Sequence, residues 1–300
     1  MAINRAQLAK ELEPGLNALF GLEYARYENE VAQIFEQESS DRAFEEEVML
    51  VGFGQANVKA EGSAVGFDTA SESFTARYVH DTIALAFALT EEAVEDNLYD
   101  SLSARYTKAL ARSMAYTKQV RGANVLNDAF TVNGGQGVPL LSVAQPTALG
   151  GTFANRSATD ADINETSLEQ AMIDIAGFID ERGLKIAMKG QKLIIPVNLQ
   201  FVVDRILEST LRVGTADNDI NALKNMGMLP GGYTVNHYLT DTDAWFVKTD
   251  CPNGFKHFVR SALATGMEGD FDTGNMRYKA RERYSFGYSD PRAAYGSAGS

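Results

Sequence analysis

The sequence predicts an α+β protein whose helices and strands are segregated along the chain. One long stretch in the first half has helical periodicity, and alternating apolar and polar residues mark half-buried strands on either side of it and near the C-terminus. A set of short predicted helices and strands lies between these regions. This order is typical of α+β folds rather than of a repeated strand–helix–strand pattern.

The composition is that of a folded protein. The chain has 300 residues, of which 45% are hydrophobic and 22% charged, and this excludes disordered and collagen-like classes. A formal net charge of −13 argues against a general nucleic-acid coat with a basic surface. The single cysteine, Cys251, excludes an internal disulfide. The longest apolar run, 83–89, is far shorter than the ~20 residues that span a bilayer, so no membrane segment is expected.

The first 50 residues are strongly acidic. They hold eleven acidic and four basic side chains, a net charge of −7. Apolar residues recur at helical spacing in two short stretches, 8–12 and 24–34, and Pro14-Gly15 and Gly21 between them are expected to break a continuous helix. The segment is therefore predicted to be an arm of short amphipathic pieces that needs a partner surface.

The next segment is predicted to be a long β-hairpin. Residues 48–53 and 74–89 have the pattern of strands, and residues 54–73 between them are mostly small. A hairpin without a large apolar face is only marginally stable alone. It should therefore project from the body and rest on another surface.

A very long helix is predicted to follow, from Thr90 to about Asn127. Thr90 is a suitable N-cap, acidic residues follow it directly, and basic residues occupy the later turns, as the helix dipole favours. Such a helix would be on the order of 55 Å long. Its larger apolar residues are spaced by four, so the apolar stripe drifts around the helix and should meet different partners along its length.

Residues 131–164 are predicted to be mostly loop, and a compact α+β unit follows. Ser167 and Gln170 fit a capping box at the start of a helix that stops at Gly183. The other predicted elements are a buried strand at 192–197, a helix at 199–209 capped by Asn198, and strands at 233–239 and 244–248.

The last predicted strand has one basic face. Its other face is largely apolar and is interrupted only by Glu282. The basic residues are Arg277, Lys279, Arg281 and Arg283.

No motif for catalysis, a metal or a cofactor is found. None of the histidines lies three or four residues from another histidine or from Cys251, so a zinc site would need distant ligands. Residues 217–221 begin like a calcium loop, but Ala222 and Met228 stand where glycine and glutamate are required. The glycines at 134–137 lack the Lys-Ser/Thr pair of a phosphate loop. We therefore expect no catalytic, cofactor-binding or metal-binding residues.

The order of these parts and four stretches of sequence carry a resemblance to a known family. The stretches are 139–142 through 150–152, 192–196, 238–246 and 288–296. The chain resembles the major capsid proteins of tailed bacteriophages, which have the HK-ninety-seven-like fold, and is similar especially to Mu-like head subunits. The likeness covers nearly the whole chain and rests on packing signatures, none of which is diagnostic alone.

The resemblance implies a division into regions. These are an N-terminal arm (1–46), an extended loop (47–81), a peripheral domain with the spine helix (82–164), an axial domain (165–261), and a returning strand with the C-terminal part of the peripheral domain (262–300).

The resemblance also implies a function. Copies of such a subunit assemble as hexamers and pentamers into an icosahedral shell that encloses phage double-stranded DNA through non-specific contacts. The shell belongs to the virion and is made in the bacterial host cytoplasm, with a portal and a decoration protein as further partners. Because the arm begins almost at Met1, a separate scaffold protein is expected. Some relatives join subunits through Lys–Asn bonds, but no matching motif surrounds Lys59.

Two other functions stay open at this point. One is the shell of an encapsulin-like nanocompartment with the same fold, which would enclose proteins instead of DNA. The other is an enzyme whose site is dispersed through the α+β unit.

The basic strand face has three interpretations, namely a solvated surface, a contact with acidic residues of another subunit, and a contact with packaged DNA. We favour the subunit contact, because the arm supplies many acidic partners. The hypothesis pairs Arg277, Lys279, Arg281 and Arg283 with Glu45, Glu46 and Glu47.

Overall fold

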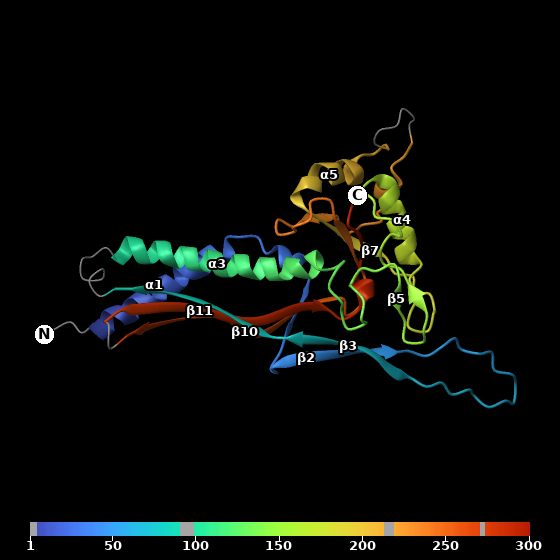
Figure 1. Cartoon of the computed structure of the whole chain (residues 1–300), viewed down its shortest axis with the longest axis horizontal. Coiled ribbons are helices and arrows are strands. Elements are labelled where there is room, and N and C mark those ends of the chain that lie inside the picture. Colours follow the sequence, from blue (N-terminus) through green and yellow to red (C-terminus); the bar gives the residue numbers. More distant parts are fainter. Residues whose placement is uncertain (1–4, 91–98, 213–218, 271–273) are drawn as a thin grey trace.

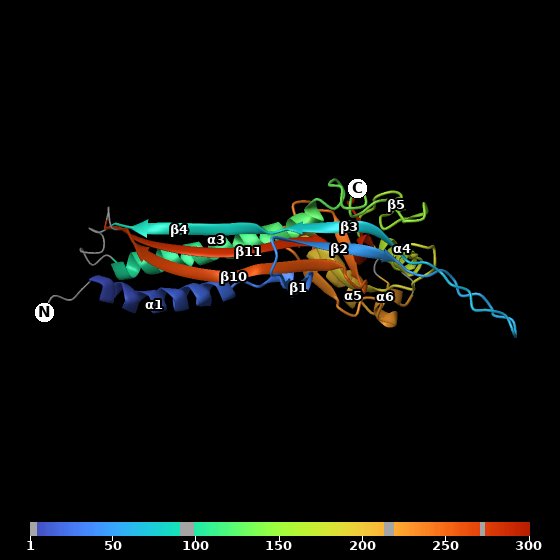
Figure 2. The same ribbon diagram turned by 90° about the horizontal axis from the view of Figure 1, so that it is seen from below.

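The computed structural model describes residues 5–90, 99–212, 219–270 and 274–300. It has an elongated part, built from long strands and two helices, and a compact part that carries the C-terminus (Figure 1). Seen from below, the long strands lie side by side with the helix α3 behind them (Figure 2). A two-stranded hairpin continues past the compact part and ends in a long loop.

The elongated part is organised by a four-stranded sheet with the order β1-β10-β11-β4. The neighbours β10–β11 and β11–β4 are antiparallel, and β1–β10 is parallel. The strands are β1 (Glu36–Ser39), β4 (Asp81–Leu89), β10 (Phe255–Gly269) and β11 (Met276–Tyr288). The sequence did not predict β10, because its second half is poor in large side chains and is held by its pairing with β11.

Helix α3 (Tyr99–Asn127) covers one face of this sheet, as its drifting apolar stripe predicts. The predicted first turns after Thr90 fall on residues 91–98, which lie outside the described residues. Its middle packs on the sheet, and its end enters a second core between the two parts of the molecule. That second core includes Leu126, Leu140, Ile194 and Phe255.

The prediction that the arm begins as short broken pieces is wrong. Residues 5–25 form one helix, α1 (Arg5–Ala25), with Pro14 inside it. Leu16 and Phe20 are buried against α3 and β11, in a cluster that includes Met114 and Tyr278. Burial of such side chains stabilises by ~1.5–3 kcal/mol each, enough together to offset the ~3 kcal/mol that an interior proline costs.

The rest of the arm also finds its partner surface within the same chain. A 3-10 helix, η1 (Glu30–Gln33), is followed by β1, which pairs with β10. Val31, Ile34 and Phe35 are buried in the core between the two parts. The amphipathic pattern predicts a segment that docks on a partner surface, and the structure places that surface within the same chain.

The predicted hairpin is present and projects from the body (Figure 1). Its strands are β2 (Phe44–Val51) and β3 (Ser71–Val79), which pair with each other. The second predicted strand, 74–89, is in fact two strands, since β3 ends before His80 and β4 then joins the sheet beside β11. The small-residue stretch between β2 and β3 has no helix or strand.

The compact part contains a second sheet with the order β12-β9-β7-β8. Its central strand, β7, is flanked by a parallel and an antiparallel neighbour. The strands are β7 (Gly190–Ile195), β8 (Tyr233–Val235), β9 (Trp245–Thr249) and β12 (Ala294–Ser297). Its helices are α4 (Glu165–Ala176), α5 (Gln200–Glu208) and α6 (Ala222–Met226), with 3-10 helices η2 (Val197–Leu199) and η3 (Pro291–Ala293). The predicted loop 131–164 holds only the short pair β5 (Gln145–Pro146) and β6 (Thr152–Phe153).

Local capping differs from the predictions. Asn164, not Ser167, is the N-cap of α4; its side chain accepts from the Ser167 backbone N–H at 2.8 Å, and Ser167 Oγ accepts from the Asn164 backbone N–H at 2.9 Å. The helix ends at Ala176, well before Gly183. Asn198 lies inside η2 and does not cap α5.

The chain crosses between the two parts more often than the proposed regions imply. Strand β10 spans the boundary placed at residue 261, although its pairing with β11 shifts in register between Val259 and Ala264. Strand β12, grouped with the peripheral region, pairs with β9 of the compact part. Both departures have one cause, since strand pairing joins segments that are distant in sequence. No helix among the described residues is long and apolar enough to cross a membrane.

Candidate functional site

The four predicted cations lie on one face of β11. Arg277, Lys279 and Arg281 are exposed and Arg283 is half-buried. The residues between them, Tyr278, Ala280 and Glu282, are buried. Alternate residues of a strand are about 6.7 Å apart, so the cations form a regular row. We call Arg277, Lys279, Arg281 and Arg283 the basic row.

Small residues flank the centre of the basic row. Lys279 lies between Ala86 on β4 and Gly266 on β10, and Arg281 lies between Ala84 and Ala264. Neither Lys279 nor Arg281 has an ion-pair partner among the described residues.

The two ends of the basic row are partly engaged. Arg277 pairs with Asp270. Arg283 Nε donates to the His80 carbonyl oxygen at 3.3 Å. One end of the row is therefore ion-paired and the other is hydrogen-bonded, whereas the centre is exposed and has no counter-charge among the described residues.

The structure does not bring the three glutamates to the basic row of the same chain. Glu47 accepts hydrogen bonds from Lys256 and Ser289 at the base of the hairpin. Glu45 accepts from Ser40 Oγ at 2.7 Å. Glu46 is exposed, and its carboxylate lies 3.6 Å from the Arg77 guanidinium. Of the three, Glu46 is the one whose position suits a contact with another molecule.

Glu282, the acidic residue that interrupts the apolar face of β11, is buried beneath α3. Its side chain is 2% exposed, and the Lys118 Nζ lies 3.4 Å from its carboxylate. Burial raises the pKa of Glu282, and the Lys118 charge opposes that rise. A carboxylate facing the helix therefore ties α3 to the sheet.

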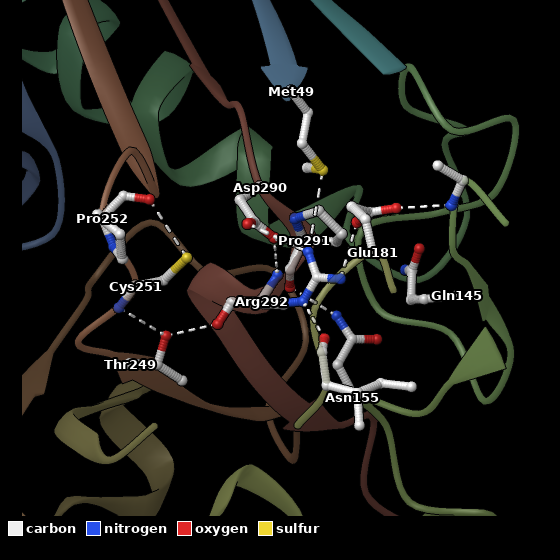
Figure 3. A network of polar contacts seen from close by, with 12 residues as sticks. Met49, Gln145, Asn155, Glu181, Thr249, Cys251, Pro252, Asp290, Pro291 and Arg292 are labelled. Carbon is white, nitrogen blue, oxygen red and sulfur yellow. Dashed lines mark hydrogen bonds and ion pairs between the residues drawn. The ribbon is translucent and has the colours of Figure 1, made fainter. Parts of the chain in front are cut away.

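A second polar cluster, which the sequence did not reveal, surrounds Arg292 (Figure 3). The Arg292 side chain is 3% exposed. Its Nη2 lies 2.8 Å from Glu181 Oε1, its Nη1 lies 3.1 Å from Asp290 Oδ1, and its Nε donates to the Ile179 carbonyl oxygen at 2.7 Å. Burial opposes the charge, but the two carboxylates outweigh it and raise the pKa of Arg292.

The Arg292 cluster joins distant segments. Met49 Sδ, at the base of the hairpin, lies 3.9 Å from Arg292 Nη1. Glu181 also accepts from the Ala148 backbone N–H at 2.6 Å, and the Arg292 carbonyl oxygen accepts from Thr249 Oγ1 at the end of β9. One buried cation thus connects the hairpin base, the loop 131–164, the compact part and the C-terminal segment.

A serine–histidine arrangement exists but does not form a catalytic site. His80 Nε2 lies 2.9 Å from Ser40 Oγ, and His80 Nδ1 lies 2.9 Å from Ser285 Oγ. A nucleophile–histidine pair needs an orienting carboxylate on the second nitrogen and access for substrate. Here a hydroxyl takes that position and His80 is 4% exposed. Burial lowers the pKa of His80. Its neutral ring is therefore packed in the interior, where it bridges the hydroxyls of Ser40 and Ser285.

The other residues that the sequence analysis considered, as metal ligands or as a nucleophile, are not brought together among the residues that the structure describes. No group of three or more histidine, cysteine, aspartate or glutamate side chains suited to a metal is found in the described part of the chain. Cys251 is half-buried, and burial raises the pKa of its thiol, which disfavours the reactive thiolate. Asn221 caps α6 by accepting from the Lys224 backbone N–H at 3.3 Å, and Asp217 lies outside the described residues.

Comparison with known families decides the identity. The profile of the family described as "Phage capsid protein" matches residues 73–297. The chain belongs to this family. No curated protein sequence matches it significantly.

Solved structures agree with the family assignment at the level of the fold. A virus-like particle from Pyrococcus furiosus matches with a TM-score of 0.56 and 11% identity, over 94% of this chain and 97% of that one. Mycobacterium phage Che8 matches with a TM-score of 0.56 and 16% identity, over 89% of each chain. The capsid of Myoviridae phage XM1 matches with a TM-score of 0.55 and 12% identity, also over 89% of each. The predicted HK-ninety-seven-like α+β fold is confirmed, and the closer likeness to Mu-like subunits stays a prediction.

Proposed function

We propose that this phage capsid protein is the major capsid protein that assembles as hexamers and pentamers into an icosahedral shell around phage double-stranded DNA. The family match over 73–297 is the observation that carries this proposal. A shell subunit derives its binding energy from contacts with its neighbours and requires no catalytic group, so we also propose that the chain is not an enzyme.

The hairpin supports assembly. The loop and the adjoining end of β2 present large apolar side chains to solvent. The loop itself extends past the body of the chain (Figure 1). Exposed apolar groups gathered on one projection are typical of an interaction surface. They are Leu50, Phe53, Val58, Val65 and Phe67, of which Val58 and Phe67 are fully exposed.

The subunit regions follow as part of the proposal. We assign α1 to β1 to the arm, the β2–β3 hairpin to the extended loop, α3 to the spine helix, and the second sheet with its helices to the axial domain. The partners proposed are further copies of the chain, a scaffold protein, a portal and a decoration protein. The location proposed is the virion, after assembly in the bacterial host cytoplasm.

The enclosed cargo tests the function. Particles purified after expression in the presence of the other phage proteins, and treated with nuclease, are expected to retain protected double-stranded DNA. The likeness to a virus-like particle supports a second candidate, an encapsulin-like compartment. Particles that contain a specific protein and no protected DNA would establish that candidate instead.

The basic row is proposed to contact Glu46 of a neighbouring subunit. Arg281→Glu should reduce the assembly yield several-fold and weaken its dependence on salt, because clustered opposite charges steer docking and are screened by ions. Glu46→Lys in the same chain should restore part of the yield. The measurement is the fraction of protein that sediments as particles at low and high salt.

Lys185→Glu is the matched control, since it makes the same charge change at an exposed position in the compact part. If Arg281→Glu and Lys185→Glu leave yield and salt dependence equally unchanged, the basic row is a solvated surface.

A further inference from the structure

The two edges of the four-stranded sheet differ sharply in how they are protected. Edge strands with free backbone groups are liable to pair with other chains unless they are short, charged or covered. Strand β1, at one edge, has four exposed residues, two of which are Glu36 and Glu38. Strand β4, at the other edge, has nine residues and carries no charge after Asp81. Among the described residues, only the β1 edge is protected in the usual way.

Strand β4 pairs on one side only. Within the described residues its strand neighbour is β11, and it lies along the margin of the sheet (Figure 2). Asp81, at its start, is paired with Arg121 of α3. Further along, Leu85 is 46% exposed although it points to the same side of the sheet as the buried Ala280 beside it. The middle of the strand thus leaves both backbone groups and apolar surface uncovered.

The sequence of β4 is self-complementary about Leu85. If two copies pair antiparallel with Leu85 opposite Leu85, then Ile83 faces Phe87, Ala84 faces Ala86, and Thr82 faces Ala88. Within 82–88, large side chains meet large ones on the helix side and small ones meet small ones on the outer side; at the two ends Asp81 would face Leu89. A shift by one residue would place large side chains against small ones.

We propose that β4 pairs with β4 of a second copy across a two-fold axis at Leu85, which joins two sheets into one. This pairing rests on the proposed shell function, because the shell supplies the second copy. The same surface patch is used by both copies, as a two-fold contact requires.

The charges of the basic row permit this arrangement. Each row lies on β11, and the two paired β4 strands would lie between the two copies of β11. Three strand spacings, about 14 Å, would therefore separate the rows. That exceeds the ~8 Å Debye length at physiological ionic strength, so their repulsion is largely screened.

The size of the contact explains when it forms. A nine-residue edge about 30 Å long and one sheet thick buries on the order of 300 Å² per copy. Stable isolated dimers bury more than ~1,000 Å² in total. The edge alone is therefore too small to hold two free subunits together, and it should pair when other shell contacts bring the copies close.

Site-specific disulfides test both the pairing and its register. In a Cys251→Ala background, which removes the only native cysteine, three variants are made: Leu85→Cys, Ala88→Cys and Thr82→Cys. Assembled particles are oxidised with copper phenanthroline and analysed on non-reducing gels. Leu85→Cys should give disulfide-linked dimers, because residues directly opposite lie ~4.5–5.5 Å apart. Ala88→Cys alone should stay monomeric, since its two copies would be about 20 Å apart.

The mixed assembly fixes the register. Thr82→Cys and Ala88→Cys, co-assembled in equal amounts, should link to each other, whereas neither links alone. Free thiols in intact Leu85→Cys particles, or equal linking by Leu85→Cys and Ala88→Cys, would overturn the pairing. Circular dichroism of each unassembled variant confirms that it folds.

Electron microscopy of the same samples separates this proposal from the shell function. If the parent chain forms no particles, the shell function fails. Oxidation of the concentrated unassembled chain then tests the pairing, because a disulfide traps even a short-lived contact that is too small to hold two free subunits together. Dimers of Leu85→Cys without dimers of Ala88→Cys would support it, and the absence of both would reject it.

Discussion

Deleting residues 54–73 is expected to abolish closed shells while the subunit still folds. The loop at the end of the hairpin makes few contacts with its own chain. Asp68 accepts from the Gly54 backbone N–H at 2.8 Å and lies 3.2 Å from Arg182 Nη1, both on the surface. The apolar side chains of the loop are exposed in the single subunit, so we expect a neighbouring subunit to bury them.

The measurement combines sedimentation with electron microscopy for assembly, and urea unfolding for the subunit. The deletion should leave the unfolding midpoint close to that of the parent. Val58→Ser with Phe67→Ser is the matched variant, because it keeps the length of the hairpin and removes only apolar contacts. It should lower the yield of particles or their heat resistance. Shells of normal size and heat resistance from the deletion would refute a role for the hairpin in subunit contacts.

Replacing Arg292 by methionine is expected to lower the free energy of unfolding of the subunit by about 3–5 kcal/mol. The reason is that Glu181, which is itself buried, would lose its counter-charge and remain uncompensated. The hairpin base would also lose its contact at Met49. Urea unfolding of the unassembled subunit gives the change directly.

Two further variants separate lost charge from lost volume. Arg292→Met with Glu181→Gln should recover part of the loss, because it removes the orphaned carboxylate. Arg292→Lys should have an intermediate stability, since it keeps the charge but cannot donate to Glu181, Asp290 and the Ile179 carbonyl oxygen at once. A loss below about 1 kcal/mol in Arg292→Met would show that the cluster is not a structural junction.

The sequence predicted well the features that depend on the spacing of residues within one helix or strand. The alternation at 276–286 placed the basic row on one face of β11. The drifting stripe after Thr90 anticipated a long helix that meets the sheet and then a second core. Such patterns depend on the spacing of side chains within one element, so no knowledge of distant partners is needed.

The errors share one physical origin, which is the effect of distant partners. Pro14 suggested a helix break, but α3 and β11 provide enough buried contact to keep α1 continuous. The run 74–89 predicts one strand, whereas the structure pairs its first half with β2 and its second half with β11. Strand β10 has a weak pattern of its own, so the sequence does not predict it, and its pairing with the distant β11 holds it in place.

The Arg292 cluster could not have been found from the sequence. Arg292 follows Asp290-Pro291 near the C-terminus, where a charged residue normally suggests a solvated turn. Its partners Glu181 and Met49 lie 111 and 243 residues away. For the glutamates of the arm, the sequence predicts a contact between subunits where the structure has one within the chain. Their abundance suggests contacts with another subunit, but Glu47 accepts a hydrogen bond from Lys256 of its own chain.

Cryo-electron microscopy of the purified particles tests the central claim most directly. The account predicts closed icosahedral shells built from pentamers and hexamers, in which the hairpin of each subunit rests on a neighbour. Sedimentation of only compact monomers across assembly conditions, with the scaffold protein supplied, would contradict it.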